Sequence, residues 1–199
     1  MAILGNSVLG ACNDILEYSG IAKRQAALST GTASPIGMAE RSLDRAHTDT
    51  LLEGYDDAML FAKAYTTAGN AVTLASTVLW VRGAGPQQHR RLTTREDKLY
   101  DLVAGSSTVF TETTVYLDVI DTIDYEDLAP RLKKLIVLRG AMDLLMQQSP
   151  SATDRINALL VRIASAELLA GPALFRPEPS NRALPMTAVL GARSGKQNA

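Results

Sequence analysis

The stretch from residue 95 to residue 139 decides the fold, because the sequence pattern changes within it. It begins Arg95-Glu-Asp-Lys-Leu-Tyr-Asp101 and runs through a threonine- and valine-rich segment to Asp124-Tyr-Glu-Asp-Leu-Ala-Pro130, which opens a long apolar-rich segment. Short β-prone runs precede Asp124, and helical spacing of apolar residues follows Pro130. We therefore interpret this stretch as the junction between a β-rich part and a helical part.

The composition is that of an ordinary globular protein. The chain has 199 residues, of which 46% are apolar and 21% are charged, enough for one domain with a real core. Its 20 basic and 21 acidic residues give a net charge of −1, which does not favour nucleic acid as a partner of the whole molecule. We expect no signal peptide and no membrane span, and therefore use in a reducing cytoplasm or in a particle assembled there.

Four segments are expected to be helices. The first covers residues 7–18, and the second starts with Ser34 as cap and Pro35 in the first turn and runs to about residue 54. The third covers residues 130–148, and the fourth follows Ser149-Pro150 and runs to about residue 170. The third is apolar around most of its circumference, so we expect it to be packed on several sides.

Between the second and third helices the pattern predicts strands. β-Prone runs occupy residues 71–74, 78–81, 103–110 and 113–120, with turn residues between them. In the last run Val115, Leu117 and Val119 alternate with polar residues, which places them on one face. Several short strands in one stretch predict a small antiparallel sheet.

These elements define the predicted architecture. The fold class is α+β: a four-helix bundle from residues 1–57 and 124–170, a β-rich insertion at residues 58–123, and an extended C-terminal arm at residues 171–199. The arm holds four of the eight prolines and shows no periodic pattern. It is either a disordered tail or an arm that becomes ordered against a partner through its apolar residues.

No motif in the sequence predicts catalysis, a metal or a cofactor. The densest acidic cluster is Asp118, Asp121, Asp124, Glu126 and Asp127, but no histidine, cysteine or glycine stands near it at ligand spacing. We interpret the single cysteine, Cys12, as a buried apolar residue. We interpret the two histidines, His47 and His89, as surface residues. The basic segment Gln87-Gln-His-Arg-Arg91 suits DNA phosphates or a protein contact, and we favour the protein contact.

Three stretches together resemble the tail tubular protein A family of short-tailed bacteriophages. The first is Ala11-Cys-Asn-Asp-Ile-Leu16, followed by Gly20 and Leu28. The second is Arg95, then Leu99-Tyr-Asp101, Thr108 and Phe110. The third is Asp124-Tyr-Glu-Asp-Leu128, then Pro130, Ile136 and Arg139. Their order and spacing cover roughly residues 8–165.

The resemblance implies a non-enzymatic virion protein. The family forms the adaptor ring, a dodecamer assembled in the host cytoplasm, between the portal protein and the tail nozzle, tubular protein B. The ring continues the DNA channel without sequence-specific binding to DNA. The arm would then bind the portal through Arg176, Arg182, Leu184, Met186 and Leu190. The segment from Gly83 to Arg91 would bind the nozzle through Gln87, His89, Arg90 and Arg91.

Two other hypotheses remain open at this point. One is a DNA-binding or regulatory helical protein that uses Arg90, Arg91 and the basic arm, and it predicts strongly salt-dependent binding to duplex DNA. The other is a hydrolase that uses the acidic cluster, in which case Asp124→Asn or Glu126→Gln would abolish activity without unfolding the protein.

Overall fold

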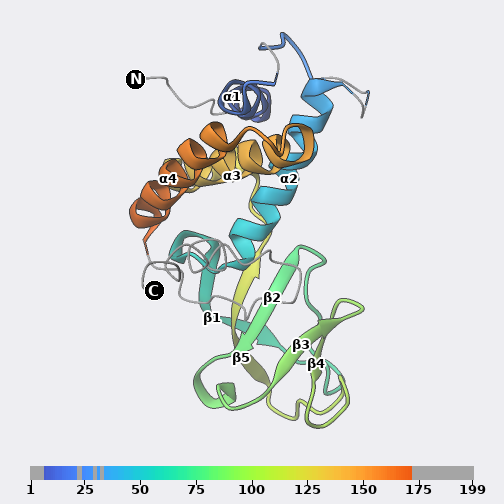
Figure 1. The fold of residues 1–199 in the computed structure, drawn as a ribbon. Helices are drawn as coiled ribbons and strands as arrows, with labels where there is room; N and C mark the ends of the chain where they lie inside the picture. The colour runs from blue at the N-terminus through green and yellow to red at the C-terminus, as the bar shows by residue number, and fades with distance from the viewer. Residues whose placement is uncertain (1–6, 22–23, 29–30, 32–33, 172–199) are drawn as a thin grey trace, which may run out of the picture.

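The computed structural model describes residues 7–21, 24–28, 31 and 34–171, and it shows a layer of helices joined to a β region (Figure 1). The α-helices are α1 (Val8–Ser19), α2 (Pro35–Leu52), α3 (Pro130–Gln148) and α4 (Thr153–Ala170). The strands are β1 (Met59–Thr66), β2 (Val78–Gly83), β3 (Leu92–Arg95), β4 (Lys98–Asp101) and β5 (Thr114–Asp121). Three short 3-10 turns complete the order: η1 (Asp56–Ala58), η2 (Gly85–Gln87) and η3 (Tyr125–Asp127).

Capping serines, a first-turn proline and a C-terminal glycine mark several of the helix ends. The Ser7 hydroxyl accepts a hydrogen bond from the Gly10 amide at 3.2 Å and caps α1, and Ser34 does the same for α2 through Gly37 at 3.1 Å. Pro130 stands in the first turn of α3, where no amide donor is needed. Gly20 ends α1 with a φ of 65°, a conformation that glycine adopts without strain.

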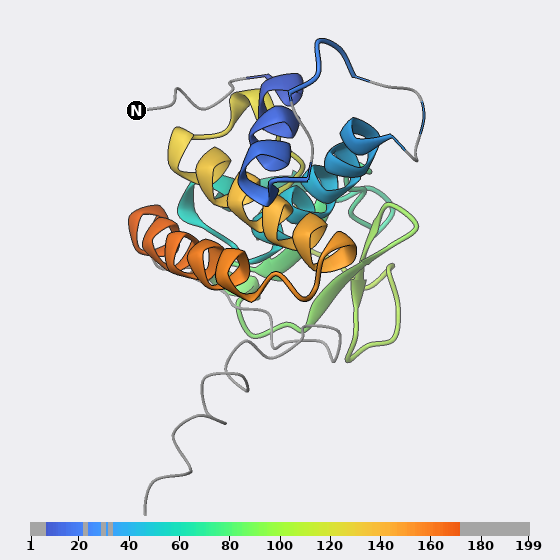
Figure 2. The ribbon, with the colours of Figure 1, turned by 45° about the horizontal axis from the view of Figure 1, so that its top comes forward.

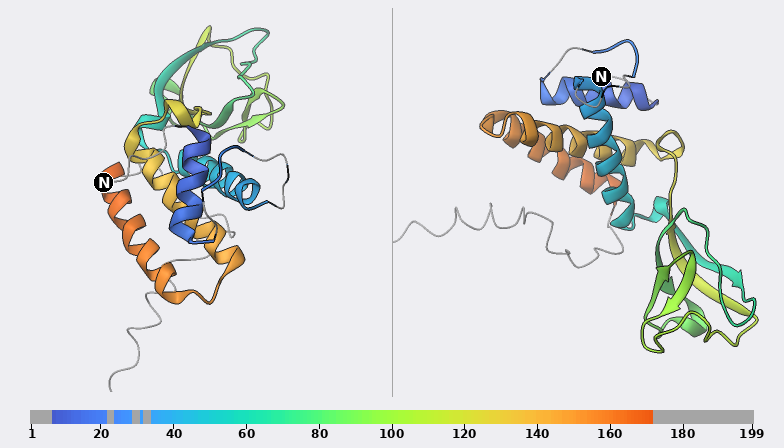
Figure 3. Two further views of the ribbon diagram at one scale, coloured as in Figure 1. Left: turned by 90° about the horizontal axis from the view of Figure 1, so that it is seen from above. Right: turned by 90° about the vertical axis from the view of Figure 1, so that its right-hand side faces the viewer.

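The four-helix bundle predicted from the sequence is wrong. In such a bundle the helices run side by side around a shared axis. Here α3 is the helix against which each of the other three packs extensively, and it lies between α4 and the pair α1–α2 (Figure 2). Helix α2 crosses the other helices instead of running alongside them (Figure 3). The apolar surface around α3 allows this arrangement, because it can be covered from several directions.

The β region consists of two antiparallel sheets. In the larger sheet β5 is the central strand, between β1 and β2. In the smaller sheet β3 pairs with β4 in a hairpin whose turn residues, Glu96 and Asp97, both have positive φ. Val115, Leu117 and Val119 of β5 are fully buried on one face, as the alternation predicted.

Strand β5 joins two apolar cores. Val115, Leu117 and Val119 belong to a core inside the β region, together with Leu99 and Phe110. The next residue, Ile120, belongs to the larger core among the helices. The strand then leads through η3 directly into α3 (Figure 1).

The other strand predictions are partly wrong. Residues 103–110 are turns and bends, not a strand. Residues 71–74 make only isolated bridges, such as that between Thr73 and Lys98. Strands β1, β3 and β4 were not predicted. The C-terminal arm, residues 171–199, lies outside the described residues from residue 172 onward.

Candidate interaction surfaces

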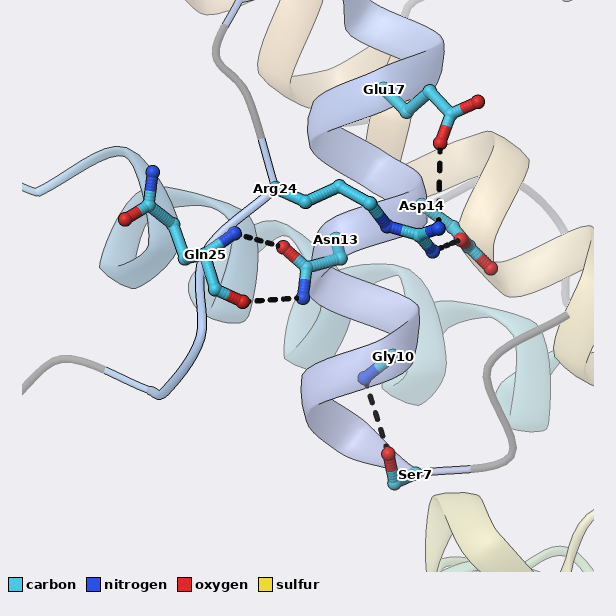
Figure 4. A network of polar contacts seen from close by, with 7 residues as sticks. All are labelled: Ser7, Gly10, Asn13, Asp14, Glu17, Arg24 and Gln25. Atoms are coloured by element: carbon cyan, nitrogen blue, oxygen red, sulfur yellow. Dashed lines mark hydrogen bonds and ion pairs between the residues drawn. The ribbon is translucent and has the colours of Figure 1, made fainter.

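The first family-like stretch holds the chain after α1 against that helix (Figure 4). The side-chain amide of Asn13 donates to the Gln25 carbonyl at 3.0 Å, and its oxygen accepts from the Gln25 amide at 2.6 Å. Next to it, Asp14 pairs with Arg24 at 2.7 Å. Both Asn13 and Asp14 are buried, so their polar groups need these partners. This Asn-Asp pair is therefore a structural clamp.

The polar stripe of α3 also serves structure. Arg139 donates to Thr50 and Glu53 at the end of α2 and to Glu167 of α4, at 3.1, 2.9 and 2.7 Å. One turn further, Asp143 accepts from Ser42 at 2.9 Å and pairs with Arg45 at 3.0 Å. These charges fix how α2 and α4 sit on α3 inside an otherwise apolar layer.

The acidic cluster of the sequence is dispersed in the structure. The Asp118 carboxylate pairs with Arg82 and accepts from the Ala62 amide at 3.0 Å, while Asp121 lies 3.9 Å from Lys63. Asp124 stands just before η3, and Glu126 and Asp127 lie within that turn. In the part of the chain that the structure describes, no three His, Cys, Asp or Glu side chains are arranged to hold a metal ion.

Cys12 and His47 lie within the helical layer. Cys12 is fully buried, and burial raises the pKa of its thiol to about 12, so the nucleophilic thiolate is suppressed. His47 on α2 is half-buried rather than on the surface as predicted, and it forms a hydrogen bond with the Ile123 backbone. Burial lowers the pKa of His47 below its usual 6.5, against the attraction of Asp44 and Asp124.

The second family-like stretch organises the end of the β region that lies farthest from the helices. Leu99 and Phe110 fill the β core, and the Arg95 guanidinium lies 4.1 Å from the centre of the Tyr100 ring. Arg90 lies 5.4 Å from the centre of the Phe110 ring. We call this end of the molecule, formed by residues 83–91 and 101–113, the distal end (Figures 1 and 3).

Arg90 connects the two segments of the distal end. Its guanidinium donates to the Glu112 carboxylate at 2.7 Å and lies 4.0 Å from the Asp101 carboxylate. The Leu102 amide donates to the Arg91 carbonyl at 2.8 Å, which ties the two backbones directly. The basic segment and the loop after β4 therefore form one surface.

The loop after β4, residues 102–105, is held in one shape by Asp101. The Asp101 carboxylate accepts from the amides of Val103 and Ala104, at 2.8 and 3.1 Å. The Asp101 carbonyl accepts from Gly105 at 2.9 Å, where a φ of 67° reverses the chain. Leu102 and Val103 stay 48% and 78% exposed, so the loop presents an apolar tip. We call it the distal loop.

The four residues predicted to bind the nozzle differ in how far they are exposed. His89 and Arg91 are exposed at the distal end. Gln87 is buried, and its side-chain oxygen accepts from the Tyr116 amide at 3.3 Å, so it supports the segment from below. Arg90 is half-buried in its contacts with Glu112 and Asp101. The five residues predicted to bind the portal lie outside the described residues.

Val103 was missed as a surface residue because it lies in the run of residues 103–110 that the pattern predicts as a strand, and Leu102 stands directly before that run. The available signal was Asp101 followed four residues later by Gly105. An aspartate that accepts from the amides two and three residues ahead replaces strand pairing with a turn. That spacing is short and common, so it does not stand out within a β-prone run.

The comparisons with known proteins are consistent with these features. The exposed apolar loop at the distal end is a candidate contact for another protein. The Tail tubular protein family matches residues 9–162, which is more than half of the chain, and the chain belongs to this family. None of the curated proteins compared with it matches.

The match confirms the resemblance to tail tubular proteins that the sequence indicated. A member of this family is a structural component of a phage virion. Its place is therefore in a phage tail, in assembly with other tail components. Of the helices described, none is long and apolar enough to cross a membrane.

Proposed function

We propose that the chain is the subunit of a head-to-tail adaptor ring, which joins the portal protein to the tail nozzle and continues the DNA channel. The observation that supports this most is its membership of the tail tubular family together with two distinct ends, one helical and one β-rich. An adaptor needs a separate surface for each neighbour. We expect twelve copies in the ring, assembled in the host cytoplasm and retained in the virion.

The proposal divides the chain into three functional parts. Residues 1–57 and 124–170 form the helical body, residues 58–123 form the β-rich insertion, and residues 171–199 form the arm. The arm binds the portal through Arg176, Arg182, Leu184, Met186 and Leu190. The insertion binds the nozzle through the distal end, where exposed His89 and Arg91 make contact while Gln87 and Arg90 hold the segment in place.

The charge of the chain suits a passage for DNA. A net charge of −1 gives the ring little electrostatic hold on phosphates. In the described chain several arginines are paired with carboxylates, such as Arg82 with Asp118 and Arg139 with Glu53. DNA would therefore slide through such a ring without being retained.

Native mass spectrometry of the chain mixed with its portal ring tests the proposal, with and without residues 172–199. The expected result is about twelve copies loaded on the portal by the full chain and none by the truncated chain. Equal loading by both proteins would refute the role of the arm. If neither loads, and the chain instead shifts duplex DNA in a strongly salt-dependent way, the DNA-binding alternative replaces the adaptor.

A further inference from the structure

The distal loop combines exposed apolar side chains with a backbone that hydrogen bonds hold in place. Val103 is 78% exposed, the most of any large apolar residue described in the β region, and Leu102 beside it is 48% exposed. The backbone hydrogen bonds to Asp101 and Arg91 hold the loop in this exposed shape.

The residue that enforces this shape is itself buried. Asp101 is 7% exposed, and its carboxylate and both backbone groups are all engaged in fixing the loop. Its amide donates to the Ser106 carbonyl at 3.0 Å, which closes the loop at its base. A loop that is already ordered loses little conformational entropy on binding, so it favours tight association with a small contact area.

We propose that the distal loop is a preformed apolar knob, which inserts Val103 and Leu102 into an apolar socket on the neighbouring tail protein. Arg91 emerges beside the knob, since its carbonyl accepts from the Leu102 amide, and among the described residues no carboxylate forms an ion pair with it. The socket is therefore expected to carry an acidic group at its rim. A phosphate backbone offers no apolar socket, so the partner is a protein. Only the choice of the nozzle as that protein rests on the proposed function.

The test measures binding of the full chain to the purified nozzle protein of the same phage. Val103→Asp is expected to weaken binding at least about tenfold, since it replaces buried apolar contact with an unpaired charge. Val161→Asp is the matched control, because Val161 is 68% exposed on α4, away from the distal end, and its change is expected to leave binding unaltered.

A second pair of variants tests the rigidity of the knob. Asp101→Asn keeps an oxygen that can accept from Val103 and Ala104, whereas Asp101→Ala removes it. We expect Asp101→Ala to weaken nozzle binding several-fold more than Asp101→Asn, with the helical circular dichroism signal unchanged in both. Equal binding by the two variants would show that the preformed shape of the loop has no role.

The outcomes separate the knob from the adaptor. If Val103→Asp binds the nozzle as well as the unaltered chain does, or Val161→Asp weakens binding equally, the knob is refuted while loading on the portal still supports the adaptor. If the unaltered chain does not bind the nozzle, the knob as stated is refuted, and portal loading alone decides the adaptor. Loss of self-association by Val103→Asp, with nozzle binding intact, would assign the loop to a contact between copies.

Discussion

Single side chains in this protein often take the place of secondary structure in joining segments. The Asn13 side chain makes both a donor and an acceptor contact with the backbone of Gln25, as a neighbouring β-strand would. The carboxylates of Asp101 and Asp118 only accept, from backbone amides of the distal loop and from the Ala62 amide. Asparagine and aspartate suit such contacts, because a short side chain with a planar polar group can reach a nearby backbone group.

The clamp at Asn13 gives the first prediction. Asn13→Ala is expected to lower the free energy of unfolding by about 1–3 kcal/mol, because two buried hydrogen bonds are lost and backbone groups of Gln25 are left without them. Urea unfolding measures the change. Asn157→Ala on the exposed side of α4 is the control, since it makes the same gain in helix propensity and should be neutral or slightly stabilising. Similar losses in both variants would contradict the clamp.

His47 gives a prediction for the dependence on pH. Because burial lowers its pKa in the folded state below the unfolded value of 6.5, folding favours the neutral ring. Its contribution is therefore complete above about pH 6.5 and is lost as the pH falls through the folded pKa. We expect His47→Gln to reduce the fall in unfolding free energy between about pH 7.5 and about pH 5.5. An unchanged pH dependence in the variant would rule out His47 as its source.

Residue types alone did not reveal which side chains face outward at the distal end. Gln87, His89, Arg90 and Arg91 look alike in a polar segment, yet η2 turns Gln87 inward and Glu112 draws Arg90 against the β core. The contacts that decide this come from residues far along the chain, such as Tyr116 and Glu112. The polar and basic character of the segment is evident from the sequence. The role of each residue in it depends on the tertiary structure.

At the scale of elements, α3 is able to meet two helices closely because of Gly140. A Cβ atom at this position would lie 2.7 Å from the Cδ1 atom of Ile15 on α1 and 3.3 Å from the carbonyl oxygen of Ser42 on α2. Both distances are shorter than ordinary van der Waals contact. The glycine therefore marks a point where α3 approaches α1 and α2 closely, and it costs α3 some intrinsic helix propensity.

Gly140→Val tests this crossing. We expect it to lower the free energy of unfolding by about 2–3 kcal/mol, because the added methyl groups overpack a fully buried contact. Lys134→Val is the control, since Lys134 is exposed on the same helix and the change there should cost only about 0.5 kcal/mol of helix propensity. Chemical denaturation of the two variants compares them, and equal losses would mean that space at residue 140 is not limiting.

Elements with strong local signals were predicted well from the sequence. Capping serines at α1 and α2, first-turn prolines at α2 and α3, and the apolar stripes indicated four helices, and alternation indicated β5. The predicted start of the fourth helix at Ser149-Pro150 is wrong, because residues 149–152 form a turn and α4 begins at Thr153 without a side-chain cap. Strand β1 was not predicted, because most of it is exposed and its sequence shows no alternation. Leu60 and Phe61, for example, lie on the surface. The β3–β4 hairpin was not predicted, because its turn, Glu96-Asp97, lacks the glycine or asparagine that usually occupies positions of positive φ.

At the scale of the whole molecule, the two cores are expected to unfold together. They share β5, and Trp80 of β2 packs against the helical core from the β side. We predict that Phe110→Ala, which empties part of the β core, lowers the urea midpoint seen by helical circular dichroism as well as that seen by Trp80 fluorescence. The expected loss is about 3–5 kcal/mol by both probes. A shift in the fluorescence midpoint alone would show that the cores are independent.

The overall arrangement of the helices was the least predictable feature. The sequence correctly indicated that α3 is covered on several sides, but apolar circumference does not specify the direction from which each helix approaches. That direction depends on local features such as Gly140 and on the partners of Arg139 on two helices. A four-helix bundle was the expectation, and α2 departs from it by crossing the other helices.

The central place of β5 has a mechanical consequence. When the helical end and the distal end are held by different neighbours, tension between them runs along this strand, which is bonded on one side to β1 and on the other to β2. Load along the strand axis shears many hydrogen bonds at once, whereas load across it would peel them one at a time. The subunit is thus expected to resist extension in the direction that joins its two ends.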